Sequence, residues 1–178
     1  MGEADVILGI KIIRKNKGSS LSPSHYIEKV LKTFKYDDCS PVSTPMDPRV
    51  KLIPNTGDAI SQLEYLQVIG CLMYAMMRTR PDIAYAVGKL SRYTSNPSTH
   101  HGLAVKRVLK YLKKSMNYCL TYTGNPLVIK GYSNVSWITN VEDHSSTSGW
   151  VFLLGEAPFR GFPRSKLASQ VRQWSRNL

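Results

Sequence analysis

The chain has 178 residues, 42% of them hydrophobic, and a formal net charge of +12 at pH 7, from 24 Lys and Arg against 12 Asp and Glu. This length allows one domain or little more, and this composition excludes a chain that is disordered throughout. The charge favours a polyanionic partner. Three cysteines without CxxC spacing favour neither a disulfide framework nor a zinc ribbon.

No membrane or secretory segment is predicted. The longest apolar run, Val68 to Met77, is about half of the ~20 residues that a bilayer span needs. The amino-terminal residues have neither the basic region nor the apolar stretch of a signal peptide. We therefore expect an intracellular protein, in the cytoplasm or the nucleus, that does not enter a membrane.

The first 55 residues predict a β-hairpin, a helix and a connector. Residues 6–13 are rich in β-branched side chains and predict a strand, which a turn joins to a short strand at 19–21. Ser22-Pro23 is typical of a helix start. Residues 40–55 hold four prolines and predict an extended connector without regular structure. The apolar residues of this helix follow helical spacing: Ile27, Val30, Leu31 and Phe34.

Three more helices are predicted between residues 61 and 114. Residues 61–64, Ser-Gln-Leu-Glu, have the pattern of a capping box. From 68 to 77 the following helix is apolar on nearly every side, so we expect it to be buried all round. Pro81 is a good first residue for the third helix, and residues 103–114 predict the fourth. The core-facing residues of the fourth helix are Val105, Val108, Leu109 and Leu112.

The carboxyl-terminal third predicts short strands. Strand patterns occur at 118–122, 127–132 and 150–154. Beyond Gly155 the residues show no convincing period, so we expect residues 156–178 to be a basic and mostly disordered tail. The chain as a whole is predicted to belong to the α+β class.

Positive charge is concentrated in the middle of the chain, where no Asp or Glu occurs between Asp82 and Glu142. A segment with only positive charge attracts nucleic acid without regard to its sequence, and it cannot supply the carboxylates that hold catalytic magnesium. The alternative is an ordinary solvated helix face, but such faces usually mix charges of both signs. The candidate nucleic-acid-binding residues are Lys89, Arg92, Lys106, Arg107, Lys110, Lys113 and Lys114.

Seven blocks of sequence, in family order, resemble the Pol polyprotein of Ty1/copia-type retrotransposons over about residues 2 to 155. A long ordered series of this kind is far more specific than any single motif. Five of the blocks are Ile7–Ile12, Leu21–Ile27, Val42–Met46, Tyr65–Tyr74 and Lys106–Lys113. The other two are each in two pieces, Thr79–Val87 with Leu90–Tyr93 and Gly131–Ser133 with Ser146–Gly155.

The resemblance implies a domain order. Residues 1–122 would be the end of a reverse transcriptase, from the palm through a helical thumb and connection. Residues 123–155 would be the truncated start of a ribonuclease H, with an incomplete antiparallel sheet. Residues 156–178 would be unrelated to the family. Gly102 replaces an expected tryptophan, which would weaken the packing beneath the basic helix.

The resemblance also implies which catalytic groups are missing. The family's enzymes use Mg²⁺, and their Tyr-x-Asp-Asp motif lies upstream of this region; Tyr36-Asp37-Asp38 lacks the intervening residue. In the run from Tyr132 to Trp137, Asn134 stands where the first metal-binding aspartate of the ribonuclease H belongs. An amide does not supply the anionic oxygen that magnesium prefers.

We therefore expect a remnant of a copia-type polyprotein that is not an enzyme, has no complete active site and binds no cofactor. Its partners would be RNA or DNA, bound without sequence specificity through the basic helix face. The alternative is a small basic nucleic-acid- or protein-binding module that the host has retained. A hidden hydrolase or nuclease is the least favoured hypothesis.

Overall fold

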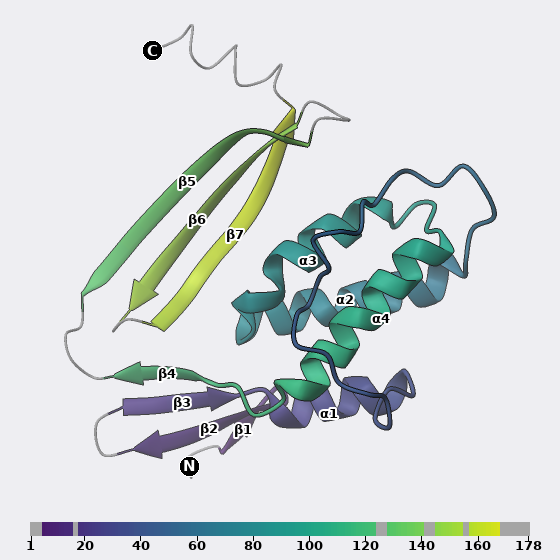
Figure 1. Ribbon diagram of the computed structural model, residues 1–178. Helices are drawn as coiled ribbons and strands as arrows, with labels where there is room; N and C mark the ends of the chain where they lie inside the picture. Colours follow the sequence, from purple (N-terminus) through teal and green to yellow (C-terminus); the bar gives the residue numbers. More distant parts are fainter. Residues whose placement is uncertain (1–4, 16–17, 124–127, 141–144, 155–156, 168–178) are drawn as a thin grey trace, which may run out of the picture. The chain divides into compact units, whose positions relative to one another are not determined.

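A computed structural model describes residues 5–15, 18–123, 128–140, 145–154 and 157–167 (Figure 1). The chain divides into two compact units, Met1–Gly124 and Asn125–Leu178. The first unit carries all the described helices, whereas the described residues of the second form strands only. The predicted α+β class is confirmed. None of the helices described is both long and apolar enough to cross a membrane.

The first unit contains a four-stranded antiparallel sheet in the order β1-β2-β3-β4. Its strands are β1 (Val6–Ile7), β2 (Ile10–Lys15), β3 (Gly18–Ser22) and β4 (Leu120–Thr123). The predicted hairpin is therefore present as β2 and β3. Strand β4 follows the last helix and pairs with β3, Leu120 opposite Leu21. This pairing joins the two ends of the unit.

The single strand expected at residues 6–13 is wrong, because the chain turns at Leu8-Gly9. Both residues have positive φ, 51° and 81°. Glycine adopts this conformation without strain, and it also leaves room for α1: a Cβ at Gly9 would lie 3.3 Å from the Cβ of Tyr26. The turn folds β1 back onto β2, with Val6 opposite Lys11.

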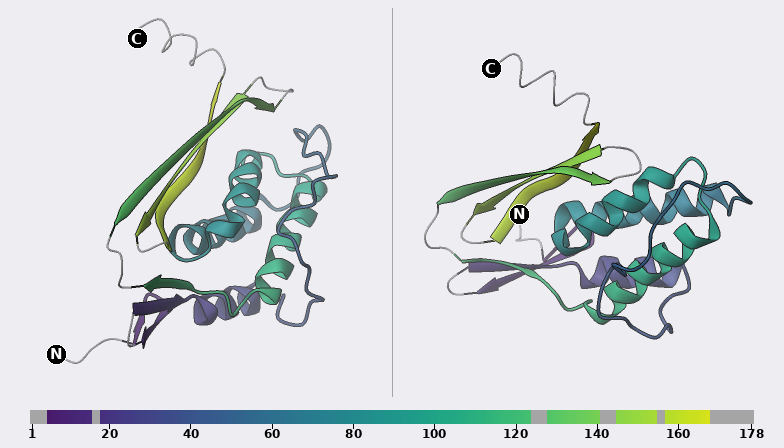
Figure 2. Two further views of the ribbon diagram at one scale, coloured as in Figure 1. Left: turned by 60° about the vertical axis from the view of Figure 1, so that its left-hand side comes forward. Right: turned by 45° about the horizontal axis from the view of Figure 1, so that its top comes forward.

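Four α-helices surround the core of the first unit (Figures 1 and 2). They are α1 (Ser24–Thr33), α2 (Gln62–Arg78), α3 (Ala84–Leu90) and α4 (Thr99–Lys114), with 3₁₀ helices at Pro81–Ile83 and Ser91–Tyr93. The predicted apolar face of α4 is buried, and so are the α1 residues Ile27, Val30 and Leu31. Phe34 packs against the same core while partly exposed. These two predicted stripes are confirmed.

Helix α2 differs from its prediction. Ser61 caps it as expected, accepting a hydrogen bond from the Glu64 N–H at 3.4 Å. However, only one of its faces is buried, since Leu66 and Met73 are 43% and 40% exposed and Met77 is 55% exposed. The apolar sequence therefore did not mean burial all round, because α1, α3 and α4 contact α2 but leave these side chains exposed.

The proline-rich connector has no regular secondary structure, as predicted. Its residues 39–47, which we call the strap, pass across α4 (Figure 1). The Val42 N–H donates to the Lys110 carbonyl at 3.4 Å, and the Lys113 ammonium donates to the Cys39 carbonyl at 2.8 Å. The strap is thus attached to the helix that carries the predicted basic face.

The second unit is a three-stranded antiparallel sheet in the order β5-β6-β7. Its strands are β5 (Ile129–Asn140), β6 (Ser145–Leu154) and β7 (Ala157–Leu167). The disordered tail expected at residues 156–178 is therefore wrong for residues 157–167. These residues pair with β6, Phe162 opposite Trp150, because backbone groups along an open strand edge take a partner whatever its side-chain pattern. Residues 168–178 lie outside the described residues.

Candidate nucleic-acid interface

Five basic residues of α4 lie on one side of the helix. At 100° per residue their spacing places them within a sector of about 120°, opposite the buried apolar stripe. The side chains of Lys106 and Lys114 are exposed, and those of the other three are partly exposed. We call this set the basic face of α4: Lys106, Arg107, Lys110, Lys113 and Lys114.

The strap occupies part of the basic face. Arg107 donates from Nη2 to the Thr44 hydroxyl at 2.9 Å and from Nε to the Thr44 carbonyl at 3.3 Å. Lys114 donates to the Ser43 hydroxyl at 2.7 Å. Together with the contact from Lys113, these bonds tie three of the five cations to the strap. Sequence reasoning missed these contacts, because a proline-rich segment has no periodicity that would indicate which helix it crosses.

The acidic partners of the basic face come from outside the acid-free stretch. Asp47 of the strap lies 3.7 Å from Arg107, Oδ2 to Nη1. Although the stretch around the helix is free of acidic residues, Arg107 therefore has a carboxylate neighbour from a distant part of the sequence. The other strap contacts are with uncharged oxygens, which leave the lysine charge in place. Within the described part of the chain, the side chains of Lys106 and Lys110 make no hydrogen bond or ion pair.

The remaining two predicted residues lie on other elements. Lys89 is in the last turn of α3, with its ammonium 5.0 Å from the centroid of the Tyr85 ring. Arg92 is exposed on the 3₁₀ helix that follows. The structure therefore brings five of the seven predicted residues together on one helix and places the other two on separate elements.

Next to the basic face, a cavity of about 500 Å³ lies between the end of α1, the start of α2 and α4. Gly102, Lys106 and Glu64 are among its lining residues. A Cβ at Gly102 would lie 2.9 Å from the Cδ1 of Ile60. The Ile60 side chain therefore occupies the space directly beside Gly102, whereas the rest of the cavity stays unfilled.

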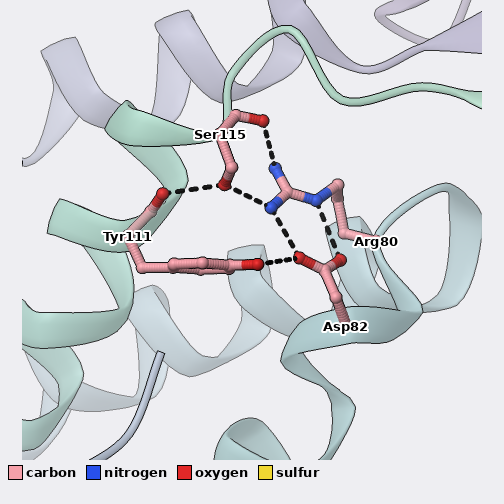
Figure 3. A network of polar contacts seen from close by, with 4 residues as sticks. All are labelled: Arg80, Asp82, Tyr111 and Ser115. Atoms are coloured by element: carbon pink, nitrogen blue, oxygen red, sulfur yellow. Dashed lines mark hydrogen bonds and ion pairs between the residues drawn. The ribbon is translucent and has the colours of Figure 1, made fainter. Parts of the chain in front are cut away.

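Sequence reasoning missed a buried polar network at the end of α4 (Figure 3). The Arg80 side chain is 1% exposed and forms a bidentate ion pair with the Asp82 carboxylate, Nε to Oδ1 at 2.9 Å and Nη2 to Oδ2 at 2.7 Å. It also donates to the Ser115 carbonyl at 3.0 Å and to the Ser115 hydroxyl at 2.5 Å. The Tyr111 hydroxyl donates to Asp82 at 2.8 Å. The network thus ties the α2–α3 corner to the carboxyl end of α4.

The charges within this network are balanced. Burial alone would raise the pKa of Asp82, but the hydrogen bonds and the charge of Arg80, together with the Tyr111 hydroxyl, lower that pKa below its ordinary value. Burial and the neighbouring Asp82 raise the pKa of Tyr111. All four side chains have partners inside the network, which therefore holds these elements together.

His101 closes the amino end of α4. It lies in the first turn of the helix, where its Nδ1 accepts from the Ser98 N–H at 2.9 Å while its own backbone N–H donates to the Ser98 hydroxyl at 3.4 Å. The ring is fully buried and stacks on Tyr93, with the ring centroids 4.0 Å apart. Burial lowers the pKa of His101. His101 is therefore a buried cap of the helix.

Among the residues that the structure describes, no three His, Cys, Asp or Glu side chains come together as metal ligands could. Asn134 lies on β5 opposite Gly149 of β6. The structure does not describe its side chain, so the loss of a metal ligand at this position stays a prediction.

Comparison with known proteins gives long matches. The chain is 38% identical over 161 residues, 85% of its length, to the retrovirus-related Pol polyprotein from transposon TNT 1-94 of Nicotiana tabacum. It is 34% identical over 179 aligned residues, 96% of its length, to the Pol polyprotein from transposon RE1 of Arabidopsis thaliana. In both cases it spans 12% of the relative's own length.

A third relative is much shorter. Over 96 residues the chain is 43% identical to the secreted RxLR effector protein 161 of Plasmopara viticola, and this match covers 53% of the chain and 68% of that relative. No protein-family model matches the chain, and no solved structure matches it.

Proposed function

Because the chain belongs to the family of copia-type retrotransposon Pol polyproteins, we propose that it is a remnant of the reverse transcriptase and ribonuclease H region of such a polyprotein. Residues 1–122 would derive from the end of the reverse transcriptase and residues 123–155 from the start of the ribonuclease H. The chain spans 12% of the long relatives, so it corresponds to a small part of the parent protein.

In this proposal the remnant does not catalyse phosphoryl transfer. Two-metal chemistry on nucleic acids needs several carboxylates around its cations. Asn134 stands where the family pattern has an aspartate, and residues 83–141 contain no Asp or Glu. A neutral amide is a poor substitute for an anionic magnesium ligand, so the residues present here do not fit the metal.

A catalytic assay tests this part directly. We expect neither primer extension nor cleavage of the RNA strand of an RNA–DNA hybrid when the full chain is incubated with Mg²⁺. Reproducible turnover that disappears on Asn134→Ala would refute the proposal, because it would assign the missing chemistry to that position.

The function retained would be sequence-independent binding of RNA or DNA. The observation that carries this proposal is the basic face of α4, whose five cations have one carboxylate, Asp47, within ion-pair distance among the described residues. Lysine and arginine side chains that neutralise phosphates displace the cations condensed on the nucleic acid, and the release of these ions drives binding. Lys106 and Lys110 are the residues expected to contribute most to binding, because the strap already binds the side chains of the other three.

The salt dependence of binding tests the interface. We expect log K for a labelled duplex to fall linearly with log salt between about 50 and 200 mM. The double variant Lys106→Gln/Lys110→Gln should weaken binding and reduce the slope by up to about 0.9 per lost phosphate contact. The matched control is Lys11→Gln/Lys29→Gln, which removes the same charge from exposed positions of β2 and α1. Equal losses in both variants would show that net charge alone is responsible.

The alternative is a retained basic module that binds nucleic acid or protein. It is favoured by the short relative, of which the match covers 68%, since a similar region there makes up most of a protein. This alternative predicts salt-sensitive binding that weakens when all five cations of the basic face are neutralised together, and an affinity that does not change with salt would contradict it.

A further inference from the structure

The strap presents a threonine in the setting that protein kinases use. Thr44 is exposed, lies outside helices and strands and is followed by Pro45. A residue before proline is restricted to extended backbone conformations, and kinases bind the acceptor segment as an extended chain. Thr-Pro is the dipeptide that proline-directed kinases phosphorylate. Thr44 therefore has the sequence of an acceptor and lies in an exposed segment without regular secondary structure.

The Thr44 hydroxyl already touches a cation. Its Oγ1 accepts from the Arg107 guanidinium at 2.9 Å, and the neighbouring Ser43 hydroxyl accepts from the Lys114 ammonium at 2.7 Å. Two long basic side chains of α4 thus converge on adjacent hydroxyl groups. A phosphate on Thr44 would replace one neutral acceptor with three charged oxygens beside the fork of Arg107.

The surrounding charge can accept an anion. A phosphothreonine carries about −1.5 to −2 charges at pH 7. The basic face supplies five cations, and Asp47 is the carboxylate that lies within 4 Å of one of them in the described structure, 3.7 Å from Arg107. The positive excess of the face therefore exceeds the charge of the phosphate.

We propose that Thr44 is a phosphorylation site for a proline-directed protein kinase and that the phosphate, held by Arg107 and Lys114, fastens the strap to α4. In the reaction the kinase transfers the γ-phosphoryl group of ATP to the Thr44 oxygen. The bond from the γ-phosphorus to the bridging oxygen of ADP breaks, the new oxygen–phosphorus bond forms, and the hydroxyl proton passes to the kinase's base. This inference does not depend on nucleic-acid binding.

The chain offers a matched control in Ser40. Ser40 is also exposed and followed by a proline, Pro41, so the same kinases accept it. In the described structure its hydroxyl makes no hydrogen bond, although the adjacent Cys39 carbonyl accepts from Lys113. Phosphate at Ser40 should therefore stabilise the strap less than phosphate at Thr44, whose hydroxyl is already bound by the Arg107 guanidinium.

The experiment uses the full chain, a purified proline-directed kinase and Mg-ATP, with phosphopeptide mapping and thermal melting as readouts. In Ser40→Ala we expect phosphate on Thr44 and a rise in Tm of about 2–4 °C at low salt, which shrinks as salt screens the pair. In Thr44→Ala we expect phosphate on Ser40 and a clearly smaller rise. Arg107→Gln should still take phosphate on Thr44 without gaining stability.

Two results would overturn the proposal. One is phosphate on Ser40 but none on Thr44 when a peptide of residues 38–49 accepts it at Thr44. The other is a change in Tm that is the same for the two phosphorylated sites or that survives Arg107→Gln. Melting of each variant before kinase treatment shows that the variant is folded, and Arg107→Lys, which keeps the charge, should retain part of the gain.

Discussion

At the scale of single residues, Arg80 shows how much depends on one buried charge. Its guanidinium is almost fully enclosed, and Asp82 and Ser115 provide its partners. A buried ion is tolerated only when its partners offset the loss of water, so removing one member leaves the others unpaired. Arg80 therefore determines whether α2, α3 and α4 stay assembled at this corner.

We predict that Arg80→Met lowers the free energy of unfolding by about 3 kcal/mol, since it leaves Asp82 and the Ser115 carbonyl without their partner. Urea denaturation of the full chain measures this loss. The control is Arg78→Met, at an exposed arginine 5.6 Å from the Tyr74 ring centroid, which should cost about 1 kcal/mol or less. Equal losses in the two variants would mean that the buried network contributes nothing of its own.

The second prediction at this scale concerns pH and His101. Its folded pKa is lowered while its unfolded pKa is ordinary, about 6.5, so the unfolded chain binds the proton more readily. The contribution of His101 to the free energy of unfolding is therefore fully present above about pH 6.5. It is lost as the pH falls through the lowered pKa of His101 in the folded chain. The slope is at most about 1.4 kcal/mol per pH unit.

Denaturation series between about pH 7.5 and pH 5 measure this slope. His101→Gln should flatten it, because glutamine does not titrate and suits the third position of a capping box. If the variant and the parent chain lose stability in parallel over this range, another group is responsible.

At the scale of elements, α2 shows that an apolar sequence does not settle which side of a helix is covered. Leu72 is fully buried, whereas its neighbour Met73 is 40% exposed. We predict that Leu72→Ala costs about 2–5 kcal/mol because it opens a cavity in the core. Met73→Gln should change the stability by no more than about 0.5 kcal/mol.

Chemical denaturation of both variants decides between a one-sided helix and one buried all round. A loss for Met73→Gln comparable with that for Leu72→Ala would restore the original expectation. It would mean that a further surface packs on this face.

At the scale of the whole molecule, the two units differ in how much they bury. The core of the first unit comprises residues from all four helices. None of the described side chains of the second unit is buried, and Ile129 and Tyr132 are 64% and 55% exposed. A sheet of three strands needs a buried hydrophobic face to be stable on its own, and the described side chains of this sheet do not provide one.

We therefore predict that amide hydrogens of β5 and β6 exchange at least about ten times faster than those in the middle of α4. Hydrogen exchange read by mass spectrometry of the full chain measures both regions in one experiment. Comparable protection of β6 and α4 would contradict this and would show that burial in the second unit is greater than its described side chains indicate.

The sequence by itself determined the local features of the fold. The spacing of Val105, Val108 and Leu109 identified the buried face of α4, and Ser61 marked the start of α2, because each signal depends on neighbours within one or two turns. The candidate basic residues and the relation to Pol polyproteins also came from the sequence. The family is confirmed, while binding through these residues stays a prediction.

Only the tertiary structure decided which segment covers each helix face and which strands pair. It showed that the strap lies on the basic face, that Arg80 is buried, that β4 completes the first sheet and that residues 157–167 pair with β6. The periodicity of one element records which of its sides is apolar, and it carries no information on the partner. That partner is chosen by long-range contacts, in which distant hydroxyls, carbonyls and strand edges satisfy charges and backbone groups that would otherwise be buried unpaired.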